Sequence, residues 1–151
     1  MSDVSDLLER YRRGTDVISQ AIEGASASEI DFKPAPGRWS IRQVINHLAD
    51  TEAVAVFRFR SIIAEDNPKM TPFNQDLWAS RTDSETRELT RALQIMRILR
   101  EDNYELLKGL SQEQRGELTL LGLVEILTNH PEKHAGQIRN NRSAYQASQS
   151  K

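Results

Sequence analysis

Residues 40–65 read SIRQVINHLADTEAVAVFRFRSIIAE, and this stretch decides the fold. Ser40 is a typical helix N-cap, and Gln43, three residues later, completes a capping box. Apolar side chains then recur at steps that suit one face of an α-helix, namely Ile41, Val44, Leu48, Ala55, Phe59 and Ile63. The stretch therefore predicts a long helix over residues 41–65, which ends before Pro68.

Three further segments share this helical period, and they cover residues 3–23, 83–110 and 118–145. No segment shows the alternation of apolar and polar residues that marks a half-buried strand. A chain of 151 residues is long enough to bury one core without disulfides or metals. We therefore predict an all-α protein, an up-down four-helix bundle, formed by a single domain over residues 1–151.

The connection between the second and third helices is unusually long. It reads NPKMTPFNQDLWASR over residues 67–81. Because about 15 residues exceed what neighbouring helices of a bundle need, we expect this loop to pack on the bundle or to serve the function. Thr82 and Glu85 form a second capping-box pair, which places the start of the third helix at residue 83. We expect that helix to bury Leu89, Leu93, Met96, Leu99, Leu106 and Leu110.

The composition excludes several classes of function. The 20 basic and 22 acidic side chains nearly cancel, so no strong field draws the chain to nucleic acid or to an anionic membrane. The absence of cysteine excludes disulfides and thiolate metal ligands. The polar start MSDVSDLLERYRR and the lack of an apolar run of about 20 residues argue against a signal peptide or a membrane span. We therefore expect a cytoplasmic protein that acts on a small-molecule substrate.

All three histidines of the chain fall on inward or nearly inward positions of predicted helices. His130 and His134, in the segment NHPEKHAGQI of residues 129–138, continue an apolar seam that comprises Leu120, Leu123, Val124, Leu127 and Ile138. His47 flanks the apolar arc of the second helix. A single H-x-x-x-H pattern is ordinarily explained by a pair of satisfied or half-exposed helix histidines. Three inward imidazoles on two helices favour a shared divalent ion instead, because the ion would satisfy one nitrogen of each ring.

Glu52 lies well inside the apolar arc of the second helix, where a carboxylate needs a partner. Three uses are open to it: to orient a ligating imidazole, to pair with an inward arginine, or to act as a general base near bound water. A position at the rim of the bundle, with access to solvent, is the ordinary alternative. We take Glu52 as the candidate catalytic residue.

The chain resembles the DinB-like superfamily of metalloproteins, also called DinB/YfiT-like. The resemblance rests on RWSIRQVINHLADTE at residues 38–52, on FNQDLW at residues 73–78 and on NHPEKHAGQI, in this order along the chain. It implies a four-helix bundle that forms a homodimer, with His47, His130 and His134 as ligands of zinc, nickel or iron and water in the open positions.

Pro131 departs from the pattern of this superfamily, because it stands directly after His130. Proline inside a helix removes one backbone hydrogen bond and clashes with the carbonyl four residues earlier. We therefore expect a kink or a restart of the fourth helix there, with Asn129 as a possible local cap for the restarted segment.

Three neutral imidazoles would leave a divalent ion its full charge and at least one open position, as in catalytic sites. Such an ion can activate water, or hold a thiol as its thiolate. The resemblance implies a metal-dependent thiol S-transferase, which uses a low-molecular-weight thiol cosubstrate such as bacillithiol, mycothiol or glutathione, or else a hydrolase. The rival interpretation is a noncatalytic dimeric bundle with a structural or vestigial metal site. A third, nucleic-acid binding, lacks a basic footprint, since Arg139 and Arg142 form too small a patch.

Overall fold

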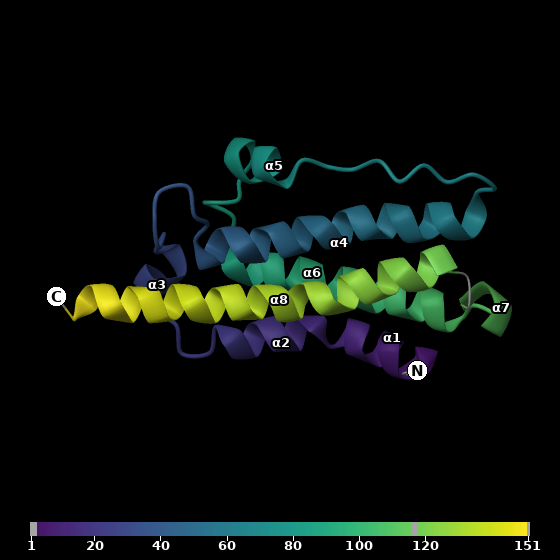
Figure 1. Ribbon diagram of the computed structural model, residues 1–151, viewed down its shortest axis with the longest axis horizontal. Helices are drawn as coiled ribbons and strands as arrows, with labels where there is room; N and C mark the ends of the chain where they lie inside the picture. The colour runs from purple at the N-terminus through teal and green to yellow at the C-terminus, as the bar shows by residue number, and fades with distance from the viewer. Residues whose placement is uncertain (1–2, 116–117, 151) are drawn as a thin grey trace.

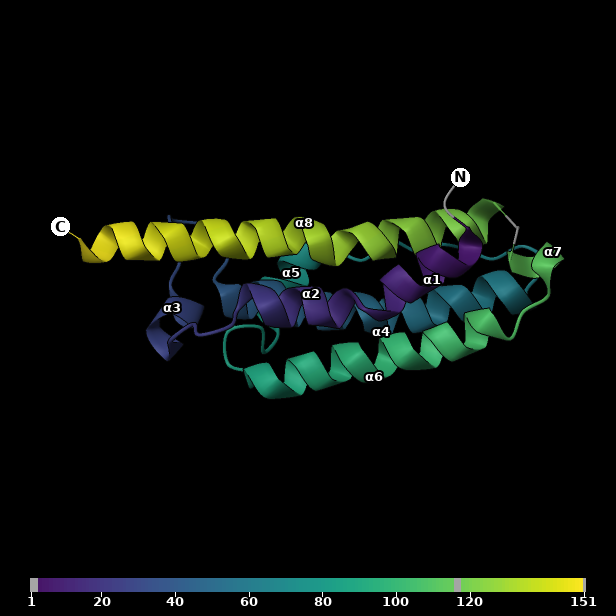
Figure 2. The same ribbon diagram turned by 90° about the horizontal axis from the view of Figure 1, so that it is seen from below.

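Four long helical segments lie side by side in the computed structural model, which describes residues 3–115 and 118–150 (Figures 1 and 2). In chain order the helices are α1 (Val4–Arg12), α2 (Gly14–Ala21), α3 (Ala27–Asp31), α4 (Ile41–Ala64), α5 (Gln75–Arg81), α6 (Leu89–Lys108), α7 (Gln112–Arg115) and α8 (Leu118–Gln149). The described residues contain no strand, so the all-α class is confirmed. No helix among them combines the length and the apolarity that a bilayer span requires.

The four-helix bundle is confirmed, and its connections give it an uncommon order. Helix α4 packs against α6 and α8, while α1 and α2 pack against α6 and α8 from the opposite side. Helices α4 and α6 run in the same direction, because residues 65–74 return along α4 as an extended segment (Figure 1). At about 3.3 Å per residue, ten extended residues span nearly the length of a 24-residue helix. The predicted up-down order therefore holds from the first to the second long segment and from α6 to α8, but not from α4 to α6.

The start of α4 is fixed as the sequence predicts. The Ser40 hydroxyl accepts a hydrogen bond from the Gln43 amide at 3.2 Å, and the Ser40 amide donates to the Gln43 side chain at 3.0 Å. The Asn141 side chain of α8 donates to the Trp39 carbonyl at 2.9 Å, one residue before this cap. The capping box thus sets the helix, and α8 holds the chain where it enters.

The predicted helix over residues 3–23 is two helices, α1 and α2, which meet at Arg13. The reason is a close approach by Arg100 of α6. A Cβ atom at Gly14 would lie 2.6 Å from the Arg100 Nη2 atom, so only glycine leaves room for the guanidinium. At the same place the Arg100 Nε–H donates to the Tyr11 carbonyl at 2.6 Å.

The third helix begins at Leu89 and not at residue 83. Thr82 closes α5 instead, since its hydroxyl donates to the Trp78 carbonyl at 2.7 Å. The predicted capping box at Thr82 is therefore wrong. The buried face of α6 is also rotated from the predicted one, and it comprises Ala92, Met96, Arg100, Asn103, Tyr104 and Leu107, whereas Leu99 and Leu106 are only half-buried.

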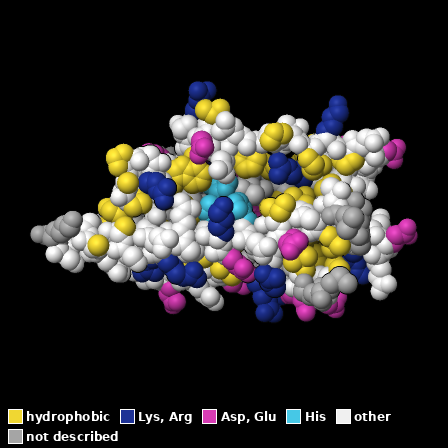
Figure 3. Space-filling view, in the orientation of Figure 1, with side chains coloured by type: hydrophobic (Ala, Val, Ile, Leu, Met, Phe, Trp, Pro, Cys, Tyr) yellow, Lys and Arg dark blue, Asp and Glu magenta, His cyan; other side chains and the backbone are white. Residues whose placement is uncertain are grey.

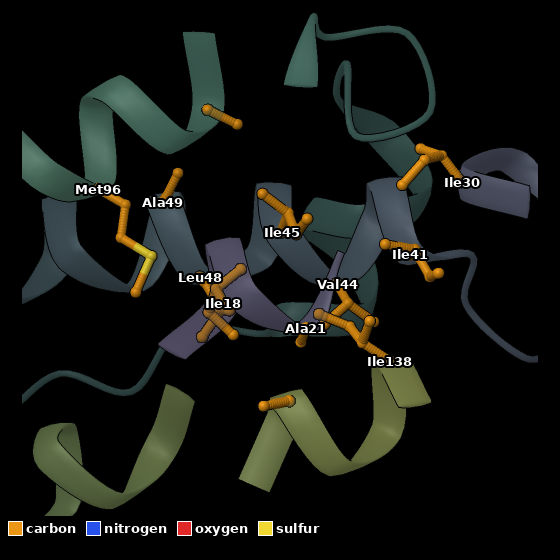
Figure 4. Packing of buried hydrophobic residues seen from close by; sticks show 12 residues of the cluster. Ile18, Ala21, Ile30, Ile41, Val44, Ile45, Leu48, Ala49, Met96 and Ile138 are labelled. Carbon is orange, nitrogen blue, oxygen red and sulfur yellow. The ribbon is translucent and has the colours of Figure 1, made fainter. Parts of the chain in front are cut away.

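Two apolar clusters fill the bundle. The first joins α2, α3, α4, α6 and α8 around Leu48 and Met96 (Figure 4). The second surrounds Phe59 and Leu107 and lies nearer to α7. On α4, Glu52 falls between the residues that belong to the two clusters, and on α6 Arg100 does the same. A buried polar layer therefore separates two hydrophobic cores.

Arg100 is the centre of this layer, with only 1% of its surface exposed. It forms an ion pair with Glu52 of α4, and its guanidinium lies 4.1 Å from the centre of the Tyr11 ring. The Tyr11 hydroxyl in turn donates to the second Glu52 oxygen at 2.8 Å, and it accepts from Asn103 at 3.1 Å. Every member of this buried network thus has a partner of opposite charge or hydrogen-bonding role.

Pro131 does not interrupt α8, which continues from Leu118 to Gln149. The prediction of a restart at this proline, with Asn129 as a cap, is therefore wrong. In a regular helix the amide of residue 131 would donate to the Leu127 carbonyl, and proline has no such amide. Arg100 replaces this donor, because its Nη2 atom donates to the Leu127 carbonyl at 3.1 Å.

Replacing Arg100 by methionine is expected to lower the free energy of unfolding by about 3–5 kcal/mol, because Glu52 would remain buried without a counter-charge. Urea denaturation followed by circular dichroism measures the change. The matched control is Arg97→Met on the same helix, whose exposed ion pair with Asp16 contributes below about 1 kcal/mol. A loss for Arg100→Met no larger than that of the control would contradict the role given to this layer. Adding Glu52→Gln to Arg100→Met should restore part of the loss.

Candidate metal centre

The three histidines meet at one point between α4 and α8. One ring nitrogen of each of His47, His130 and His134 lies within 4.8 Å of the others. The Nε2 atom of His130 is 3.3 Å from that of His47 and 3.0 Å from that of His134. In Figure 3 the histidines are visible in a depression on the face formed by these helices. The inward placement predicted for all three is thus confirmed.

The spacing of these nitrogens suits a single ion. Nitrogen ligands at about 2.0–2.1 Å from a tetrahedral Zn²⁺ lie about 3.3 Å from one another. Two of the three separations, 3.3 Å and 3.0 Å, are close to this value, and all three nitrogens lie within 4.8 Å of one another. Within the described ranges the cluster contains no carboxylate and is made of three imidazoles alone. The donor set therefore fits a divalent transition metal with at least one open position.

Gln137 fixes the orientation of His134. The Nδ1 atom of His134 lies 2.8 Å from the Gln137 side-chain oxygen. Because an amide oxygen only accepts, Nδ1 carries the hydrogen and Nε2 turns its lone pair toward the other histidines. Gln137 was not predicted from the sequence, although its position three residues after His134 on the same helix places the two side chains within reach of each other.

Aromatic residues cover His47. The centre of its ring lies 5.2 Å from that of Trp39 and 6.4 Å from that of Phe73, with which it is stacked. The ring centres of Phe73 and Trp78 are 4.8 Å apart. The Thr51 hydroxyl donates to the His47 carbonyl at 2.9 Å. The long connection, which carries Phe73 and Trp78, therefore packs over the histidine centre. The expectation that this loop packs on the bundle is met at this point.

Burial keeps the imidazoles neutral. It lowers the pKa of His47 to about 4 and that of His130 to about 3, with further lowering by neighbouring positive charge. The pKa of His134 is also lowered, mainly by burial, although its bond to Gln137 acts in the opposite direction. At neutral pH all three rings thus offer lone pairs, which is the state that binds a metal.

Glu52 is buried, with 2% of its surface exposed, and its partners are Arg100 and Tyr11. Burial raises the pKa of its carboxyl, while Arg100 and Tyr11 lower it. Of the uses predicted for this residue, pairing with an inward arginine is the one that the contacts show. No hydrogen bond joins it to an imidazole among the described residues. Its catalytic role stays a prediction.

A polar cavity of about 350 Å³ opens beside the centre. His134 and Gln137 form its inner wall, and Arg38, Lys133 and Asp76 bring charges to it. The cavity therefore gives a small polar molecule access to His134, with two cations close by.

Comparison with known proteins agrees with this architecture. The model of the DinB superfamily matches residues 10–138. YfiT of Bacillus subtilis, named as an inferred metal-dependent hydrolase, is 30% identical over 97 residues, which are 64% of this chain and 54% of that protein. A protein of Geobacillus thermodenitrificans with the same kind of name is 24% identical over 146 residues, 90% of this chain and 82% of its own length. A solved structure of B. subtilis YfiT, described as an unusual four-helix bundle, aligns with a TM-score of 0.84 at 22% identity, and the alignment covers 93% of this chain and 86% of that one.

The stability of the metal-free protein is expected to fall as the pH drops from 6.5 toward 4.5. In this range the unfolded chain protonates its histidines, whereas the folded chain, with pKa values of about 4 and about 3 at His47 and His130, does not. Each histidine that behaves in this way lowers the free energy of unfolding by up to about 1.4 kcal/mol for each pH unit of acidification.

The measurement is urea denaturation at several pH values in the presence of a chelator. In His130→Gln the free energy of unfolding should depend less steeply on pH, because glutamine does not titrate. The slope should correspond to about one proton fewer taken up on unfolding than in the wild type. A dependence equally steep in the variant would mean that His130 is not held neutral in the folded chain.

Proposed function

Because the chain belongs to the DinB superfamily, we propose that it is a metal-dependent enzyme in which His47, His130 and His134 hold one divalent ion. The observation that carries the proposal is the convergence of three imidazole nitrogens from two helices, with no protein carboxylate among them in the described chain. Zinc, nickel and iron all suit imidazole ligands. The names of the related proteins, which are those of metal-dependent hydrolases, support the same class.

When bound, the ion would supply Lewis acidity, which makes water or a thiol nucleophilic at neutral pH. The residues around it perform the other tasks. Gln137 keeps the lone pair of His134 turned toward the ion site, and Trp39 and Phe73 exclude water from the outer side of His47. Arg38 and Lys133 attract an anionic or polar substrate into the cavity beside His134.

Hydrolysis of a small molecule is the reaction that the names of the relatives favour. Transfer of a low-molecular-weight thiol to an electrophile is the second candidate. An all-imidazole ligand set leaves the ion its full charge, which would stabilise a thiolate. A structural site would normally need a fourth protein ligand, and Glu52, the buried carboxylate closest in sequence to His47, is already paired with Arg100.

The metal site is tested by the metal content of the purified protein after chelation and reloading with Zn²⁺, Ni²⁺ or Fe²⁺. We expect about one ion per chain for the wild type and a loss of stoichiometric binding in His134→Ala, because one of the three ligands is removed. Gln137→Leu should weaken metal binding about 10–100-fold, since it leaves His134 unoriented. The exposed Gln146→Leu on the same helix is the control. Full metal retention in His134→Ala would refute the three-histidine site.

The reaction class is tested with the metal-loaded protein and two panels of substrates. Cleavage of esters or amides without added thiol would identify a hydrolase, whereas consumption of an electrophile only in the presence of glutathione or another thiol would identify an S-transferase. Either activity should disappear in His134→Ala, because the ion would be lost. Full metal occupancy with no turnover in either panel would favour the noncatalytic bundle.

A further inference from the structure

A second cavity of about 360 Å³ lies at the other end of the seam between α4 and α8, under the extended segment of residues 65–74. Its walls are mainly apolar and include Ile62, Met70, Leu123 and Ile126. Ile126 is 66% exposed, and the Met70 side chain is partly exposed as well. Ile62 and Leu123 also pack against the second apolar cluster, whereas Ile126 and Met70 leave apolar surface that a ligand can reach. We call it the α4–α8 groove.

The α4–α8 groove lies along the same two helices as the histidine centre. Ile126 stands one turn before His130, or about 6 Å along the axis of α8. Arg58, at the far wall, follows His47 by eleven residues on nearly the same face of α4, which is about 16 Å. In Figure 3 hydrophobic side chains continue from the histidines toward the end of the molecule that carries α7. One elongated molecule could therefore contact both sites.

Gly122 keeps the groove open. A Cβ atom at this position would meet no atom within 4 Å, so packing does not require glycine there. Glycine in the interior of a helix is less stable than alanine by about 1 kcal/mol. The chain therefore retains an unfavourable residue where the only structural effect is free space in the groove.

Arg58 supplies a cation without a carboxylate partner in the part of the chain that the structure describes. Its Nη2 atom donates to the Thr71 carbonyl at 3.0 Å. Its Nε–H is buried and has no hydrogen-bond acceptor among the described atoms. Buried N–H groups of folded proteins are nearly always bonded, and a guanidinium binds carboxylates strongly. The wall of an apolar groove thus contains a guanidinium whose charge no carboxylate of the described chain balances.

We infer that the α4–α8 groove binds the apolar body of an elongated, carboxylate-bearing substrate, with the carboxylate on Arg58 and the reacting group at the three histidines. The inference rests on the proposed function, because it assigns the substrate class of that same site. Free space at Gly122 accommodates the chain of the ligand, and the Arg58 guanidinium, which has no carboxylate partner in the described chain, receives its anionic end.

Isothermal titration with octanoate, and with 1-octanol as its neutral equivalent, tests the inference on the full chain. Octanoate should bind the wild type more tightly than octanol does. Gly122→Leu should weaken octanoate binding at least tenfold, because the new side chain occupies the groove. Gly136→Leu is the matched control, since its Cβ also meets no atom within 4 Å on the same helix, and it should change affinity less than twofold.

Arg58→Gln should weaken octanoate binding about tenfold and leave octanol binding within twofold, because only the charged bond is removed. Equal affinity for octanoate and octanol, equal octanoate affinity in Gly122→Leu, or no saturable binding of octanoate at millimolar concentration would each overturn the inference.

Metal content, measured on the same samples, separates the two proposals. A wild type that binds octanoate but no metal would refute the proposed metal site while the binding assignment of the groove stands. A variant Gly122→Leu that keeps its metal and loses octanoate would show that the groove acts independently of the ion. In metal-loaded protein that hydrolyses esters, Gly122→Leu should raise KM for a long-chain ester whose terminal carboxylate can reach Arg58 while its ester group lies at the histidines, and it should leave KM for an acetyl ester unchanged. An equal change in KM for both esters would overturn the link between groove and histidines.

Discussion

The buried guanidinium of Arg100 is the constraint on which the rest of the structure depends. It starts from α6 and reaches three other helices, through the Tyr11 carbonyl of α1, the Glu52 carboxylate of α4 and the Leu127 carbonyl of α8. A charge that is 1% exposed is tolerated only when it is paired and its donors are satisfied. Because the partners belong to different helices, Arg100 can contact all of them in only one alignment of the helices along the bundle axis. The two apolar clusters on either side supply most of the burial energy, and this layer fixes how the helices align.

The same guanidinium makes the histidine centre compatible with Pro131. Proline between two ligand positions would ordinarily leave the Leu127 carbonyl without a donor and favour a kink. Since Arg100 donates to that carbonyl, α8 remains continuous and His130 and His134 stay one turn apart on one face. The positive charge of Arg100 also contributes, after burial and the other histidines, to the lowered pKa of His130. Core and site are therefore linked by a single side chain.

Local period and capping were enough to predict α4, most of α8 and the inward placement of the three histidines. These features depend on residues that are close together in sequence, such as Ser40 with Gln43, or His130 with His134. The break at Arg13, the rotated face of α6 and the unbroken helix at Pro131 were not predictable in this way. All three involve Arg100, a residue type that is usually exposed and whose partners lie 27 to 89 positions away. Hydrophobic periodicity counts every arginine as a surface residue. It therefore assigned Leu99 to the core in place of Arg100.

The surroundings of the three histidines depend on the topology of the bundle as well as on the helices. Because α4 and α6 run in the same direction, the chain must return along the whole length of α4, and it does so as the extended segment of residues 65–74. That return places Phe73 over His47 and brings Met70 to the wall of the α4–α8 groove. A strictly alternating bundle with short loops would leave the histidines at an open surface between two helices. The long connection of this DinB-superfamily chain therefore creates partly apolar surroundings around the three histidines.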